Sequence, residues 1–143
     1  ALRPIAIGID FRSSGSNTGG PLKVVHDTTE GSSVYGVFET FAVHRTGPHF
    51  SVDIATIYQH IDTGVAARAM RNNIGGVQTN RDSAIQIEVV GFVGASKNVQ
   101  TLRNVARLYR WIEVTHGVPR VWPSGAQCTL VPGSCLTIVR LLS

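Results

Sequence analysis

The apolar residues of this chain change their spacing from segment to segment, and this limits the fold more than any other feature. Residues 21–26 and 83–92 alternate with the period of two that is typical of β-strands. Residues 34–43 and 98–116 place apolar side chains three and four positions apart, as amphipathic helices do. Residues 49–61 alternate with a slip of one position, which indicates two strands or one strand broken by a turn. This order predicts an α/β fold with a mixed β-sheet flanked by helices.

Length and composition indicate one compact domain. The chain has 143 residues, of which 43% are hydrophobic and 15% are charged. The Gly-, Ser- and Asn-rich stretches 13–20 and 72–76 have the composition of loops, so we expect a single domain over residues 1–143. No stretch approaches the roughly 18 apolar residues of a membrane span, and we expect no membrane insertion. The lack of a G-x-G-x-x-G or P-loop motif argues against a doubly wound nucleotide-binding fold.

The net charge of +4 is concentrated near the C-terminus, where residues 101–143 hold five arginines against Glu113. Such a bias favours an anionic partner, which could be a cell-wall polymer, a membrane surface or a nucleic acid, or it marks a solubilising helix face. No aromatic and basic recognition module accompanies Arg103, Arg107 and Arg110. We therefore expect no nucleic-acid binding.

Two side chains are candidates for chemistry. Glu88 stands mid-strand among Ile and Val residues, where desolvation would raise its pKa towards that of a general base, unless it lies on an exposed face of the sheet. His26 ends a strand beside a polar turn and could bind zinc, although a structural or surface histidine is the alternative. Without a G-x-S-x-G elbow or a local signature at Cys128, nothing favours covalent catalysis.

Three ordered stretches share one resemblance. They read Pro21-Leu-Lys-Val-Val-His-Asp-Thr-Thr-Glu-Gly31, then Pro48-His-Phe-Ser-Val-Asp53 with Ile57-Tyr-Gln59, then Gln78-Thr-Asn-Arg-Asp-Ser-Ala-Ile-Gln-Ile-Glu-Val-Val-Gly91. Together they resemble the N-acetylmuramoyl-L-alanine amidases of the peptidoglycan-recognition superfamily, especially the amidase modules of endolysins from phages of mycobacteria and related actinobacteria. The likeness covers about residues 21–122, and residues 123–143 diverge. It implies a mixed sheet flanked by helices and zinc-dependent hydrolysis of the amide bond between N-acetylmuramic acid and L-alanine in peptidoglycan.

The resemblance also implies roles for individual residues. His26 matches the first zinc ligand, and Glu88 matches the acidic residue that takes a proton from the zinc-bound water. His49, Arg68 and Asn80 match positions at the substrate groove and are expected to contact peptidoglycan. The implied protein is phage-encoded or secreted and acts on the cell wall outside the membrane, and we expect a monomer.

The tail departs from this pattern. The family supplies a histidine and then an aspartate or cysteine after its last helix, whereas no histidine follows His116 here. Cys128 and Cys135 could replace the missing pair in a Cys2His zinc site, or could form a disulfide or stay buried as free thiols. The alternative is a divergent tail on a domain that binds peptidoglycan with an incomplete metal site and impaired catalysis.

Overall fold

The computed structural model describes residues 5–6, 15–17, 23–69, 84–118 and 120 of the chain. In chain order its elements are β1 (Ile5–Ala6), β2 (Lys23–Thr28), α1 (Val34–His44), β3 (Phe50–Val52), β4 (Ile57–Gln59), β5 (Ala84–Val89) and α2 (Val99–His116). Apart from the short β1, this is the order that the apolar spacing predicts.

The strands form one mixed sheet in the order β1-β4-β3-β5-β2. The β3 and β4 strands pair antiparallel, whereas β1 with β4, β3 with β5, and β5 with β2 pair parallel. The predicted α/β class with a mixed sheet is therefore confirmed. Because β2, β3 and β5 run in the same direction, they end at the same edge of the sheet, where side chains distant in sequence meet.

A tight turn breaks the 49–61 segment into β3 and β4, as the slip in its alternation predicts. The Asp53 carboxylate accepts hydrogen bonds from the backbone N–H groups of Ala55 and Thr56, at 2.8 and 2.7 Å. The Asp53 N–H donates in turn to the Thr56 carbonyl at 3.0 Å. An aspartate that bonds to the backbone two and three residues ahead favours a turn over a continuous strand.

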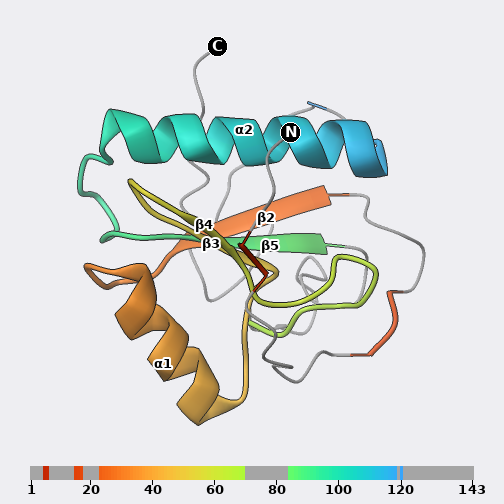
Figure 1. Ribbon diagram of the computed structural model, residues 1–143, viewed down its shortest axis with the longest axis horizontal. Helices are drawn as coiled ribbons and strands as arrows, with labels where there is room; N and C mark the ends of the chain where they lie inside the picture. The colour runs from red at the N-terminus through yellow and green to blue at the C-terminus, as the bar shows by residue number, and fades with distance from the viewer. Residues whose placement is uncertain (1–4, 7–14, 18–22, 70–83, 119, 121–143) are drawn as a thin grey trace.

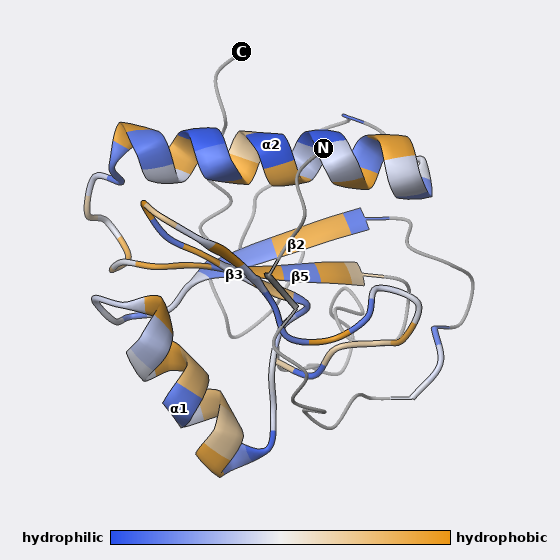
Figure 2. Ribbon diagram, viewed as in Figure 1, coloured by the Kyte–Doolittle hydropathy of each residue, from blue (hydrophilic) through white to orange (hydrophobic). Residues whose placement is uncertain are grey.

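Helix α2 covers one face of the sheet and α1 lies on the other side (Figure 1). The apolar stripe of α2 packs on the sheet and its polar side faces outwards (Figure 2). The core under α2 consists of Phe50, Val52, Ile57, Ile85, Ile87, Val89, Val105, Leu108, Ile112 and Val118. Within the described residues, no helix is both long and apolar enough to cross a membrane.

Both helices begin at a polar N-cap residue, and α2 ends at a glycine. The Ser33 side chain accepts from the Gly36 N–H at the start of α1, and Asn98 accepts from Gln100 at the start of α2. Gly117 ends α2 in the left-handed conformation, with φ of 66°, directly after the segment 98–116 whose apolar spacing predicts a helix.

We predict that Asn104→Ala lowers the free energy of unfolding by about 1–3 kcal/mol. The side chain is 7% exposed, and its Nδ2 donates to the carbonyls of Asp53 and Ile54, which ties α2 to the β3–β4 turn. Denaturant unfolding would measure the loss. Arg107→Ala, an exposed change one turn away, is the control, and equal effects of both changes would contradict the assigned role of Asn104.

Candidate active site

Glu88 lies at the centre of a polar row near the carboxyl edge of the sheet. Its register partners are Asp27 on β2 and Ser51 on β3, each one residue before the end of its strand. Aligned residues of neighbouring strands point to the same face, and here it is the face opposite α2. The Ser51 Oγ lies 2.8 Å from the Nε2 of His60, whose ring contacts Phe38 of α1, so the row faces the α1 side.

The Glu88 carboxyl group is desolvated, as its position in the sequence predicts. The residue is 7% exposed. Burial, followed by the nearby charges of Asp27 and Glu30, raises its pKa to about 8. Glu88 therefore holds a proton at neutral pH and can release it to a base slightly above neutrality. Such a carboxyl group is suited to proton transfer.

The turn after β2 is bonded to the segment after β5, which supports the acidic row. Thr29 donates from its N–H to the Val89 carbonyl at 3.1 Å, and its Oγ1 accepts from the Gly91 N–H at 3.2 Å. Glu30 adopts a left-handed φ of 50°, and its carboxylate accepts from the Val93 N–H at 2.8 Å and from the Thr28 hydroxyl. The Thr-Thr-Glu turn is thereby held against the end of β5.

Asp27 is the acidic neighbour that sequence reasoning missed. Burial raises its pKa, a hydrogen bond from the Thr28 N–H opposes that rise, and the charge of Glu30 adds to it. Asp27 directly follows His26, but only the pairing of β2 with β5 shows that it stands beside Glu88. The Asp-Thr-Thr-Glu pattern offered a signal, because two acidic residues around a strand end are unusual in a buried sheet.

His26 points into the core on the α2 side. It is 3% exposed, and its Nδ1 lies 2.6 Å from the hydroxyl oxygen of Tyr109 on α2. Its register partner is Ile87, a residue of the core under α2. The resemblance implies that His26 and Glu88 act at one zinc site, whereas the register places them on opposite faces of the sheet.

His49 is fully buried and joins three segments. Its Nδ1 accepts from the Gln86 N–H at 2.9 Å, so its Nε2 carries the proton that is donated to the Val65 carbonyl at 2.8 Å. Burial lowers its pKa to about 4 and keeps the ring neutral. In this arrangement both nitrogens are engaged within the protein, and the ring supports the loop that leads to Arg68.

The other predicted site residues divide between described and undescribed parts of the chain. Arg68 has an exposed side chain, and its N–H donates to the Gly47 carbonyl at 3.0 Å. The neighbouring Ala69 N–H donates to the side chain of Gln86 at 2.8 Å, which fixes the loop over β5. Asn80, Cys128 and Cys135 lie outside the described residues.

A hollow of about 300 Å³ opens beside the turn after β2. It is lined by Thr29, Glu30, Gly31, Ser32, Ser33, Gly36, Val37, Thr40 and Phe41. Glu30 belongs both to this hollow and to the charges that raise the pKa of Glu88. The hollow is at the small end of the range for ligand pockets and has polar and apolar walls.

The described residues do not assemble a metal centre. No group of three His, Cys, Asp or Glu side chains within them is arranged to hold an ion. His26 faces Tyr109 across the core, away from Asp27, Glu30 and Glu88. In this arrangement, a zinc site using His26 would require further ligands from other parts of the chain.

Several solved structures share this fold. The N-acetylmuramoyl-L-alanine amidase LysC from Clostridium intestinale matches with a TM-score of 0.65 and 14% identity, over 82% of this chain and 79% of that one. PGRP-Hd from Alvinella pompejana matches with a TM-score of 0.63 and 13% identity, over 92% of this chain and 90% of that one. A mutant endolysin from Bacillus subtilis matches with a TM-score of 0.55 and 18% identity, over 83% and 80%.

The fold of this chain is thus the one shared by N-acetylmuramoyl-L-alanine amidases, endolysins and PGRP proteins, as the three sequence stretches predict. The sequence matches no protein-family model and no curated protein sequence. The narrower likeness to endolysins of actinobacterial phages stays a prediction.

We predict that Glu88→Gln makes the protein more resistant to unfolding at alkaline pH. The pKa of Glu88 is about 8 in the folded protein and about 4.5 ordinarily, so between these values the folded state keeps a proton that the unfolded chain releases. The free energy of unfolding of the parent should fall as pH rises from about 4.5 to about 8, by a few kcal/mol in total. The variant should lose this slope.

Denaturant midpoints measured from pH 5 to pH 9 would test this prediction. Glu39→Gln, a change of an exposed residue on α1, is the matched control and should keep the slope of the parent. Parallel pH profiles for the parent and Glu88→Gln would mean that Glu88 is not the group responsible.

Proposed function

We propose that this protein hydrolyses the amide bond between N-acetylmuramic acid and L-alanine in peptidoglycan, with Glu88 moving the proton. Two observations support the proposal. The fold is shared with LysC, an N-acetylmuramoyl-L-alanine amidase, and the acidic residue of the Ile-Glu strand is a buried carboxyl group with a pKa of about 8. The buried carboxyl group of Glu88 carries the proposal, because a fold alone does not determine a reaction.

Hydrolysis of an amide needs a group that takes a proton from water and returns one to the nitrogen. Water attacks the carbonyl carbon, the C–N bond breaks, and the departing amine must be protonated. In its ionised form Glu88 would accept the proton of the attacking water and then donate it to the amine. Asp27 and Glu30 strengthen its basicity, since their charges disfavour ionisation of a third nearby carboxyl group.

The substrate would approach from the face that carries the polar row. The hollow beside the Thr-Thr-Glu turn can take a small polar group such as part of the peptide or sugar. Arg68 offers an exposed cation for a carboxylate of the stem peptide. Asn80 is a further proposed contact with peptidoglycan. His49 would act indirectly, by holding the loop before Arg68.

Zinc is the cofactor that the family resemblance implies, with His26, Cys128 and Cys135 as its proposed ligands. The described residues do not complete this site, since no three His, Cys, Asp or Glu side chains among them are arranged to hold an ion and His26 lies on the face of the sheet opposite Glu88. Zinc dependence is therefore a proposal separate from the role of Glu88.

A second function is favoured by the orientation of His26. If His26 serves as a core residue, the chain would bind peptidoglycan through the face of the polar row and hydrolyse it poorly or not at all. Burial of the imidazole against Tyr109 is the observation that favours this alternative.

We predict that Glu88→Gln lowers turnover of peptidoglycan about 10²- to 10⁴-fold. The amide has the same shape but cannot accept a proton, so the variant should be no less stable to heat than the parent at neutral pH. In the parent, the rate should rise with pH and reach half of its plateau near pH 8, because the ionised form is the base. Release of free amino groups from purified walls between pH 6 and pH 9 would measure both effects.

Glu39→Gln serves as the control and should leave the rate unchanged, since Glu39 is exposed on α1. A Glu88→Gln variant that turns over peptidoglycan at the parental rate would exclude Glu88 as the base. A parent that binds walls but releases no amino groups would favour the second function.

Metal analysis discriminates between the two functions. The amidase function predicts about one zinc per chain after purification without chelator, and His26→Ala should lose both metal and activity. The binding function predicts no zinc, with retention of the protein on insoluble peptidoglycan. In that case His26→Ala and Tyr109→Phe should both destabilise the fold, because each removes one partner of a buried contact.

A further inference from the structure

The outward side of α2 carries a stripe of arginines. Arg103, Arg107 and Arg110 stand four and three residues apart, which places them on one side of the helix, and all three are exposed. The first and last are separated by about 10 Å along the helix axis. Two exposed valines, Val99 and Val114, flank the stripe at either end. We call these three arginines the α2 arginine stripe.

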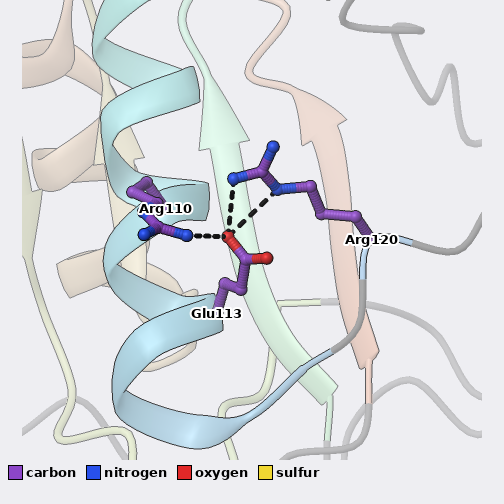
Figure 3. A network of polar contacts seen from close by, with 3 residues as sticks. All are labelled: Arg110, Glu113 and Arg120. Carbon is purple, nitrogen blue, oxygen red and sulfur yellow. Dashed lines mark hydrogen bonds and ion pairs between the residues drawn. The ribbon is translucent and has the colours of Figure 1, made fainter.

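Glu113 partly offsets this charge. Its Oε2 accepts from Arg110 Nη1 at 2.8 Å and from Arg120 Nε and Nη2 at 3.0 and 2.7 Å (Figure 3). The arginines lower the pKa of the Glu113 carboxyl group, so it is ionised at neutral pH. Arg103, Arg107, Arg110 and Arg120 together with Glu113 carry a net charge of +3.

The stripe lies on the side of the sheet opposite Glu88, Asp27 and Glu30. The apolar stripe of α2 packs on the sheet, and the row of Glu88 faces the α1 side. The buried carboxyl groups and the α2 arginine stripe therefore lie on opposite sides of the sheet. A ligand on the arginines would not occupy the proposed catalytic face.

We infer that the α2 arginine stripe binds a linear phosphodiester polymer of the cell wall. Guanidinium groups match phosphate geometry with paired hydrogen bonds, and a row of three along a helix suits a chain of regularly spaced anions. The choice of a wall polymer rests on the proposed peptidoglycan substrate. The binding itself requires no contribution from Glu88, and the two claims can fail independently.

The same stripe is poorly suited to a membrane or to single-stranded nucleic acid. The apolar side of α2 is buried on the sheet, so the helix has no apolar face to insert between lipids. Its large aromatic residues, Tyr109 and Trp111, pack against the core and cannot stack on bases. Charge complementarity with a flexible polyanion is what the exposed surface offers.

The probe is lipid-free poly(glycerol phosphate), with binding measured by calorimetry from 20 to 300 mM NaCl. The logarithm of the association constant should fall linearly with the logarithm of salt concentration, with a slope of about −2 for three neutralised phosphates. The triple change Arg103→Gln, Arg107→Gln and Arg110→Gln should weaken binding at 20 mM salt at least roughly tenfold. The triple change to lysine should retain most of the binding, because it keeps the charge.

Glu113→Gln should change polymer binding in the direction opposite to the triple glutamine change. Removal of this carboxylate releases Arg110 and Arg120, and should tighten polymer binding roughly two- to fivefold, the range that one exposed charge supplies. A gain of binding cannot arise from unfolding. Glu88→Gln should leave polymer binding unchanged, so failure of the catalytic proposal is distinguishable from failure of this one.

Three results would overturn the proposal. The first is equal binding by the parent and the triple glutamine variant. The second is a salt slope near zero. The third is tighter binding of single-stranded DNA or of phosphatidylglycerol vesicles than of poly(glycerol phosphate), which would reject the wall polymer as the partner.

Discussion

The pairing of β2 with β5 is the constraint on which the rest of the site depends. In a parallel pair, aligned residues share a face, so the register decides which side chains meet. Asp27 aligns with Glu88, and His26 aligns with Ile87. A slip of one residue would bring His26 beside Glu88 and move Asp27 into the apolar core under α2. The turn after β2 opposes such a slip, because Thr29 and Glu30 are bonded to the segment after β5.

This register places the unfavourable burial of a carboxyl group and the capacity for proton transfer at the same residue, Glu88. Burial of a carboxyl group beside two others opposes its ionisation, and the protein keeps Glu88 protonated at neutral pH. The opposite face of the sheet carries the compensating apolar core, with Ile85, Ile87 and Val89 of the same strand almost completely buried. One strand thus contributes stability on one face and a perturbed acid on the other. Such a division is typical of a functional site supported by a rigid scaffold.

The two faces also separate two kinds of interaction. The α1 side combines buried acids with a polar hollow, which favours a specific ligand held by short contacts. The α2 side presents exposed arginines on a helix whose apolar side is already buried, which favours a screened and less specific attraction. For a protein that acts on an insoluble polymer, the second interaction would raise the local concentration of substrate for the first. The sheet separates the buried carboxyl groups from the arginines.

The sequence by itself determined the elements and their class. Apolar spacing located α1, α2 and the longer strands, the slip in alternation within residues 49–61 indicated a break, and three short stretches indicated the amidase fold. It also offered two environments for Glu88, a desolvated position or an exposed face of the sheet, and the structure shows the first.

The tertiary structure alone decided how these pieces face one another. Each strand pattern shows which residues share a face of that strand, but not which face of the next strand lies alongside. That is why Asp27 was missed, and why the sequence did not show that His26 faces Tyr109 on the side of the sheet opposite Glu88. Register and layer order arise from contacts between residues more than 60 positions apart in the chain, and a local period carries no information about them.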